Sequence, residues 1–120
     1  MKIAVTSTSK GLDAFVDPRF GRAAYILVVD VDTLAFEVID NDANVNAFKG
    51  AGIQAASAVS QKGASVLLTG YCGPNAFKTL SAAEIKVVQN VEGTVKEAVA
   101  QFKEGKLKFS DAPNAEGQGM

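Results

Sequence analysis

Some segments of the chain are short β-rich apolar runs, and others repeat apolar residues with the period of a helix. The short runs predict five strands. Runs at 2–7, 24–30 and 34–40 predict the first three strands. The link between the second and third runs is too short for a crossover, so these two strands should form an antiparallel hairpin. A continuous apolar run at 65–69 predicts a parallel strand covered on both faces, and 85–90 predicts a last short strand.

Three other segments follow the helical period. The first, 44–63, is rich in alanine and should turn Ile53 and other apolar side chains inward. The second begins at Pro74, since proline is favoured at the first helical position. The third follows Thr94 and Glu97, which form the sequence signature of a capping box. The order βββαβαβα predicts an α/β fold in which right-handed crossovers build a largely parallel sheet.

The predicted sheet has a reversal of winding beside its first strand. That strand should be central, with the hairpin on one side and the parallel units on the other. Ligands of open α/β sheets gather beyond the carboxyl ends of the strands at such a reversal. Three segments should meet there: the loop 8–21 after the first strand, "FKGAG" at 48–52, and "GYCGPN" at 70–75. This edge of the sheet is the predicted ligand site.

Length and charge narrow the classes of function. A chain of 120 residues with 48% hydrophobic content fits one domain, expected over 1–107, and the polar segment 108–120 should be a flexible tail. Twelve basic and thirteen acidic residues give no general attraction for nucleic acid or anionic membranes, so neither is an expected partner. No apolar run approaches the ~20 residues of a membrane span, and the cytoplasm is the expected location.

Glycines at two predicted helix starts favour an anionic ligand. Gly50 and Gly52 allow close approach, so N–H groups at that helix start can point at an anion, with Lys49 adding positive charge. Gly73 and Pro74 would act in the same way at the next helix. The same glycines are equally compatible with plain helix capping and close packing on the sheet, because a bare GxG pattern is weak.

The segment "DPRFGRA" presents two arginines in the loop before the second predicted strand. Arg19 and Arg22 flank Phe20 and Gly21. Arginine suits a planar or polyanionic ligand better than lysine does, because its guanidinium group is a flat fork of donors. The alternative is an ordinary turn in which the arginines pair with Asp13 and Asp17.

Cys72 is the single cysteine of a chain that has no histidine. A partly exposed thiol near a helix start would have its thiolate favoured, but a nucleophilic cysteine normally needs a nearby base. A closed zinc site needs four Cys or His ligands, so a soft metal here would take its other ligands from outside the polypeptide, as water or sulfide. Cys72 either supports such a group by contact or is a small buried residue of the core.

Aspartates near the predicted hairpin allow a different class of function. The two ends of the hairpin carry Asp30, Asp32, Asp40 and Asp42, and the first loop carries Asp13 and Asp17, so a magnesium-dependent hydrolase could be assembled from them. The four hairpin aspartates are also at turn positions, which favour aspartate for backbone reasons. The turn interpretation is preferred, and no catalytic activity is expected.

Several stretches together carry a family resemblance: "MKIAV", "DPRFGRAAYILVVD", "FKGAGIQAA", "LLTGYCGPNAFKTLSAAEIKVV" and "GTVKEAVAQF". Over residues 1–107 the chain resembles the dinitrogenase iron–molybdenum cofactor biosynthesis family, small proteins related to the nitrogenase cofactor carriers. The family fold implies a ribonuclease H-like motif, a five-stranded mixed sheet in order 3-2-1-4-5 with an antiparallel second strand and three helices. Within the family the chain is most similar to a protein of sulfate-reducing bacteria that holds a molybdenum–copper–sulfide cluster noncovalently.

Carried over residue by residue, the resemblance implies a cluster pocket made from three segments. Its residues are Arg19, Phe20, Gly21, Arg22, Lys49, Gly50, Ala51, Gly52, Tyr71, Cys72, Gly73, Pro74 and Asn75. Many relatives carry histidine just before "FGR", where this chain has Arg19, and this departure argues against direct iron ligation. The expected function is a carrier of an anionic thiomolybdate-type cluster. The alternatives are a carrier of an iron–molybdenum precursor and a metal-free regulatory module, and family relatives often work beside partitioning-type ATPases.

Overall fold

The computed structural model describes residues 1–41 and 51–114. In this part of the chain the strands are β1 (Lys2–Ser7), β2 (Tyr25–Asp30), β3 (Phe36–Asp40), β4 (Val66–Leu68) and β5 (Lys86–Val88). The helices are α2 (Ala51–Gln61), α3 (Pro74–Ala82) and α4 (Val95–Lys103). Each lies within a segment predicted from the sequence, and the predicted opening of the first helix at 44–50 lies outside the described residues.

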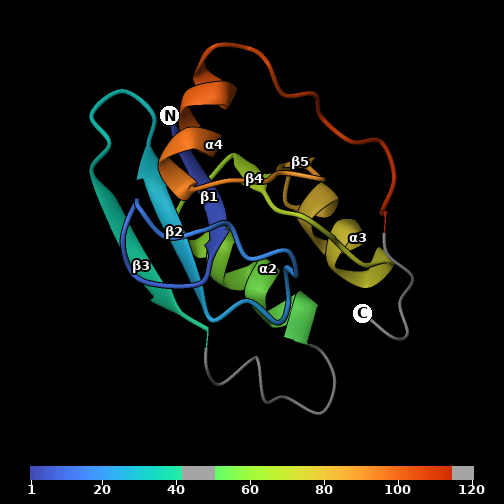
Figure 1. Ribbon diagram of the computed structural model, residues 1–120. Coiled ribbons are helices and arrows are strands. Elements are labelled where there is room, and N and C mark those ends of the chain that lie inside the picture. Colours follow the sequence, from blue (N-terminus) through green and yellow to red (C-terminus); the bar gives the residue numbers. More distant parts are fainter. Residues whose placement is uncertain (42–50, 115–120) are drawn as a thin grey trace.

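The five strands form one sheet in the order β3-β2-β1-β4-β5. β2 pairs in antiparallel fashion with both β1 and β3, while β1–β4 and β4–β5 are parallel pairs. The predicted strand order and the antiparallel β2 are therefore confirmed. Because the winding reverses at β1, the carboxyl ends of β1, β4 and β5 and the loops that follow them lie at one edge of the sheet (Figure 1).

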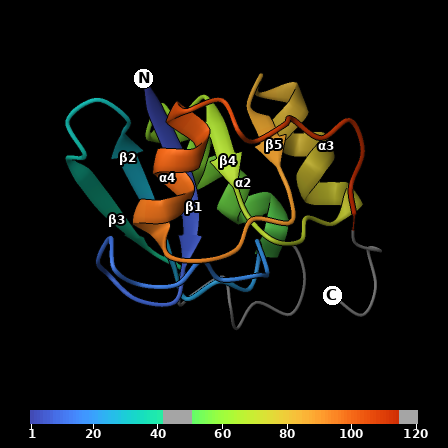
Figure 2. The same ribbon diagram turned by 45° about the horizontal axis from the view of Figure 1, so that its top comes forward.

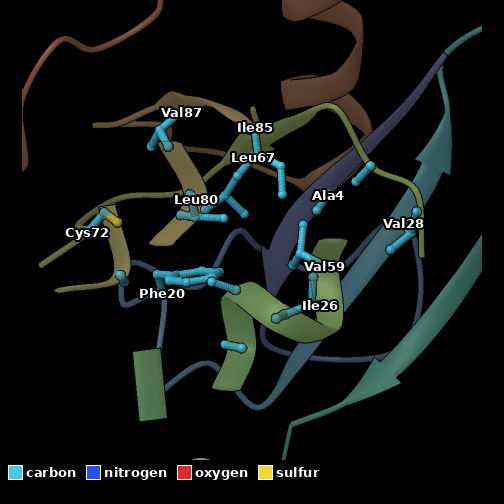
Figure 3. Close-up of a cluster of buried hydrophobic side chains, with 14 residues drawn as sticks. Ala4, Phe20, Ile26, Val28, Val59, Leu67, Cys72, Leu80, Ile85 and Val87 are labelled. Atoms are coloured by element: carbon cyan, nitrogen blue, oxygen red, sulfur yellow. The ribbon is translucent and has the colours of Figure 1, made fainter. Parts of the chain in front are cut away.

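Helices cover both faces of the sheet, with α4 on one face and α2 and α3 on the other (Figures 1 and 2). β1 serves both layers by alternation: Ile3 and Val5 pack in the cluster beneath α4, and Ala4 packs in the cluster beneath α2 and α3. Figure 3 shows the second cluster, in which Leu67 and Val59 meet from the sheet and α2. Burial on both faces explains why the inner strands read as continuous apolar runs.

The inner side of α2 differs from the prediction by one position. Ile53 is 44% exposed, whereas Ala55, Ala56 and Val59 are buried. These three residues continue a stripe that begins at Gly52, with the spacing i, i+3, i+4, i+7. Ile53 lies about 100° around the helix from that stripe, so its side chain points to the surface beside the predicted ligand site.

Residues 108–114, called the C-terminal strap below, run past the edge strand β5 and α3 (Figure 2). Ser110 N donates to Val87 O of β5 over 2.7 Å, and Gln89 Nε2 donates to Ala112 O over 2.8 Å. This is the described part of the segment predicted as a flexible tail, and residues 115–120 lie outside the described residues. The domain boundary at residue 107 stays a prediction.

Candidate functional site

Two of the three segments predicted to converge are joined directly at the carboxyl edge of the sheet. Tyr71 N, just after β4, donates to Pro18 O over 2.6 Å, and Phe20 N donates to Tyr71 O over 3.1 Å. These bonds form a short parallel bridge between Arg19 and Tyr71. The loop after β1 therefore lies against the β4–α3 loop, as the topology predicted.

Gly70 permits this contact and was not singled out from the sequence. A Cβ atom on Gly70 would lie 2.6 Å from Pro18 O and 2.7 Å from Pro18 Cα, far inside van der Waals contact. Only glycine lets the two backbones approach so closely. A glycine directly after a buried strand is the signal available in the sequence, but the partner 52 residues away is not visible there.

A buried polar network fixes the backbone on which Arg19 stands. Thr6 Oγ1 lies 2.6 Å from Asp17 O and 3.0 Å from Thr69 Oγ1, which ties the loop to the ends of β1 and β4. Asp17 Oδ1 accepts a hydrogen bond from Arg19 N over 3.0 Å. Asp17 thus serves the loop backbone, and within residues 1–41 and 51–114 the exposed Arg19 guanidinium forms no ion pair.

The start of α3 lacks a side-chain cap among the described residues. Gly73 is the N-cap in extended conformation and Pro74 is the first helical residue, as predicted. The first intrahelical bond joins Phe77 N to Gly73 O over 2.9 Å. Proline has no N–H, so the donors left at this end among the described residues are the backbone N–H groups of Gly73, Asn75 and Ala76. The helix dipole adds positive potential at the same place.

The start of α2 packs directly against the start of α3. A Cβ atom on Gly52 would lie 2.9 Å from Ala76 Cβ, so the two helix starts are closer than any larger residue would allow. Gly52 is the described end of the third converging segment. Lys49 and Gly50 lie outside the described residues, so their part in the site stays a prediction, as does that of the neighbouring Ala51.

The side chains of Phe20 and Cys72 lie beneath the site, in the core shared with Leu80 (Figure 3). Burial raises the pKa of the Cys72 thiol to about 12, so the group is protonated at neutral pH. A favoured thiolate was expected only for a partly exposed thiol, and that condition is not met because Cys72 is buried. The alternative prediction, that Cys72 is a core residue, is confirmed.

Exposed apolar side chains surround this edge of the sheet. Tyr71, next to Arg19, is 43% exposed, and Ile53 at the start of α2 is exposed to a similar degree. Phe15 is the most exposed large apolar side chain among the described residues, at 65%, and its backbone bridges to Thr94. Phe15 was missed from the sequence because a single aromatic residue in a polar loop gives no periodic signal.

The hairpin aspartates build a turn. Asp30 Oδ1 accepts hydrogen bonds from Asp32 N over 2.9 Å and Thr33 N over 3.2 Å, and these bonds hold the pKa of Asp30 below its usual value. The turn interpretation of Asp30 is therefore confirmed. In the part of the chain that the structure describes, no three Cys, Asp or Glu side chains are grouped to hold a metal ion.

One residue outside every predicted site reaches this edge. Asn114 of the strap accepts a hydrogen bond at Oδ1 from Cys72 N over 3.0 Å. Its Nδ2 donates to Gly70 O over 2.9 Å and to Asn90 Oδ1 over 3.2 Å. A polar residue in a polar terminal segment gave no sequence signal for these contacts.

A comparison with protein families and a comparison with solved structures point to the same group of proteins. The model of a family described as dinitrogenase iron-molybdenum cofactor matches residues 1–105. The solved apo form of the orange protein from Desulfovibrio gigas is 52% identical, with a TM-score of 0.92 over 95% of this chain and 96% of that one. No curated protein matches.

More distant solved structures share the same architecture. An NMR structure of a Thermotoga protein, described provisionally as a NifB protein of the DUF35 family, is 35% identical, with a TM-score of 0.78 over 90% of this chain and 91% of that one. A Methanocaldococcus jannaschii protein described provisionally as a dinitrogenase is 19% identical, with a TM-score of 0.71 over 94% of this chain and 97% of that one. At this level of identity the similarity concerns the fold alone. Within the described residues, none of the helices has the length and apolar character needed to cross a membrane.

Proposed function

The chain belongs to the dinitrogenase iron–molybdenum cofactor family, and on that premise we propose that it carries a noncovalently bound, anionic molybdenum–copper–sulfide cluster. The cluster is the cargo, and the role needs no catalytic turnover. The proposed site is the edge where the Arg19 loop meets the starts of α2 and α3. Cytoplasmic location and partitioning-type ATPase partners remain predictions that accompany this proposal.

The observation that carries the proposal is the open start of α3. Its Asn75 and Ala76 N–H groups have no acceptor among the described residues, and the positive end of the helix dipole, worth about half an elementary charge, lies with them. The α2 start is packed beside it through Gly52. A helix start with free N–H groups is a preorganised set of donors for an anion.

The side chains at this edge suit a cluster that brings its own ligands. Cys72 is buried and protonated, and the chain has no histidine, so the described residues offer hydrogen-bond donors and positive charge in place of metal ligands. A thiomolybdate-type cluster already surrounds its metals with sulfide and is negatively charged. Arg19 would neutralise part of that charge, and the exposed ring of Tyr71 would provide an apolar wall.

The other residues of the predicted pocket contribute through the backbone or through charge. Gly21 and the half-buried Arg22 continue the Arg19 loop, and Gly73 presents its backbone beside Asn75. Phe20 and Cys72 would support the loop from below, because their side chains lie in the core. Lys49, Gly50 and Ala51 complete the proposed pocket.

An iron–molybdenum precursor is the second candidate, because the family is named for the iron–molybdenum cofactor. Elemental analysis separates the two candidates directly. Protein purified from its native host should show visible absorption bands together with molybdenum and copper if the main proposal holds. Iron in place of copper would favour the precursor, and a colourless metal-free protein would favour a metal-free regulatory module.

Reconstitution tests the site itself. The purified chain is titrated with tetrathiomolybdate and copper(I), and uptake is followed by visible absorption and metal content after desalting. Arg19→Ala should weaken uptake several-fold, because it removes a positive charge that forms no ion pair within residues 1–41 and 51–114. Lys2→Ala is the matched control, since it removes the same charge from the opposite end of β1. Equal loss in both variants, or no uptake by the unaltered chain, would contradict the proposed function.

A further inference from the structure

The Asn114 side chain places an acceptor oxygen on the loop that leads into α3. Cys72 N, one residue before the N-cap of that helix, donates to Asn114 Oδ1 over 3.0 Å. Asn75, the first of the two donors assigned above to an anionic ligand, follows Cys72 by three residues along the chain. The strap therefore satisfies by itself one N–H of the loop on which the proposed ligand depends.

The strap is held to the domain by hydrogen bonds and by one aromatic contact among the described residues, between Phe109 and Phe102 of α4, whose ring centroids lie 6.3 Å apart. Ser110 is half-buried and the other residues of 108–114 are exposed, including Phe109 at 50%. Its hydrogen bonds to the domain are the Ser110–Val87 backbone bond, the bonds of the Gln89 side chain to Ala112 O and Asn114 N, and the side-chain bonds of Asn114. Hydrogen bonds at an exposed surface exchange readily with water, so such a segment opens locally without unfolding the core.

We propose that the C-terminal strap is a latch on the β4–α3 loop, in which Asn114 competes with the anionic ligand. This inference rests on the proposed function. A bound anion draws the N–H groups of this loop toward itself, and Asn114 gives up its bond to Cys72 N when the loop is loaded. By linkage, a ligand that displaces the strap binds more weakly than it would to a chain without the Asn114 contact.

The opposite role would be a brace, in which Asn114 holds the loop in its binding conformation. Its Nδ2 bonds to Gly70 O and Asn90 Oδ1 do connect the ends of β4 and β5. However, the Gly70–Tyr71 backbone is already held without the strap, because Tyr71 N donates to Pro18 O and Gly70 O accepts from Asn90 N. The preceding Thr69 is fixed as well, through its N–H bond to Val88 O and its side-chain bond to Thr6. The latch and the brace predict opposite changes in affinity when Asn114 is replaced.

The test uses the full chain and two variants, Asn114→Ala and the control Ser110→Ala. The control lies in the same strap, and its side chain makes no hydrogen bond in the described residues while its backbone bond is kept. Without ligand, amide hydrogen exchange at Cys72 should become several-fold faster in Asn114→Ala and stay unchanged in Ser110→Ala. Unchanged exchange at Cys72 in Asn114→Ala would overturn the latch before any metal is added.

Titration with tetrathiomolybdate and copper(I) then shows whether replacing Asn114 raises or lowers the affinity for the cluster. Asn114→Ala should bind about fivefold more tightly than the unaltered chain, the equivalent of one surface hydrogen bond. In the unaltered chain, loading should speed amide exchange at Ser110 as the strap leaves β5. Equal or weaker binding by Asn114→Ala would overturn the latch and leave the proposed function intact, whereas no uptake by any variant would overturn both.

Discussion

α3 and α4 both begin after a parallel strand at the same edge of the sheet, but the backbone N–H groups at their starts differ in whether they have acceptors. In α4, Thr94 Oγ1 accepts from Glu97 N over 3.1 Å, and Glu97 Oε1 accepts from Thr94 N over 2.9 Å. The two donors between them, Val95 N and Lys96 N, bond to carbonyl oxygens of the β1 loop over 2.8 and 2.9 Å. Every donor of the first turn of α4 is satisfied inside the protein.

The start of α3 has none of these devices. Its N-cap is a glycine without a side chain, its first residue is Pro74, and Asn75 and Ala76 keep their N–H groups without a side-chain cap in the described residues. The donors at the start of α4 are thus satisfied inside the protein, whereas the start of α3 leaves donors without an acceptor among the described residues. We interpret the second helix start as the functional one for this reason.

The largest expected effect comes from separating the α3 start from the Arg19 loop. Gly70→Ala would place a Cβ atom 2.6 Å from Pro18 O, so the two loops must move apart. Overpacking of this kind costs about 1–3 kcal/mol of unfolding free energy, and cluster uptake should be lost as well. Urea unfolding measures the first effect and reconstitution the second.

Gly11→Ala is the control, because no atom lies within 4 Å of its Cβ position. Its unfolding free energy should stay within about 0.5 kcal/mol of that of the unaltered chain. A Gly70→Ala variant as stable as Gly11→Ala would show that the close approach of the loops is not needed.

Thr94→Ala should affect the start of α4 and leave the start of α3 unchanged. Loss of the capping box is expected to cost about 1 kcal/mol of unfolding free energy, without effect on cluster uptake. Urea unfolding and reconstitution on the same preparation measure both quantities. Uptake that falls in step with stability would contradict the assignment of separate roles to the two helix starts.

Gly52→Ala should do the reverse and act on the site more than on stability. The new Cβ atom would meet Ala76 Cβ at 2.9 Å and push the two helix starts apart by a few tenths of an ångström. Alanine gains up to about 1 kcal/mol over glycine inside a helix, which offsets part of that strain. We expect cluster affinity to fall several-fold with little change in thermal stability, measured by titration and thermal unfolding.

The smallest effect concerns pH and the Glu97 carboxylate. Hydrogen bonds from the Thr94 backbone and side chain lower the pKa of Glu97 in the folded protein. A lowered pKa means that the folded state favours the carboxylate, so this contribution is present above the unfolded pKa and disappears as the pH falls through the folded pKa. The stability difference between the unaltered chain and Glu97→Gln should therefore be present at pH 7 and shrink below about pH 4. A difference that does not change with pH would contradict this role for Glu97.

The contrast between the helices also explains what could be predicted from the sequence. The capping box at the start of α4 depends only on two residues three positions apart, Thr94 and Glu97. It could therefore be predicted from the sequence, and the structure confirms it. The sheet order follows from strand periodicity, crossover length and the family resemblance together, and it was also confirmed. For α2 the helical period was predicted correctly, but Ile53 was assigned to the buried side and is exposed. An isoleucine looks like a core residue in the sequence, and only the structure shows that Gly52 occupies the buried side in its place.

The parts of the site that depend on distant contacts could not be predicted. The pKa of Cys72 is set by burial in a core that other elements build, and a local helix start gives the opposite expectation. Gly70 is required by Pro18, and Asn114 reaches Cys72 from 42 residues away. Such pairs have no fixed spacing in the chain, so only the folded structure reveals them.

The most direct test of the account follows the backbone amides during loading. ¹⁵N-labelled protein is titrated with tetrathiomolybdate and copper(I), and amide shifts are recorded at both helix starts. The account predicts the largest changes at Asn75 and Ala76 and in the Arg19 loop, with Lys96 and Glu97 at the start of α4 unaffected. Shifts centred on the α4 start, or no shifts at Asn75 and Ala76 while the cluster is bound, would contradict the claim that the open start of α3 is the binding site.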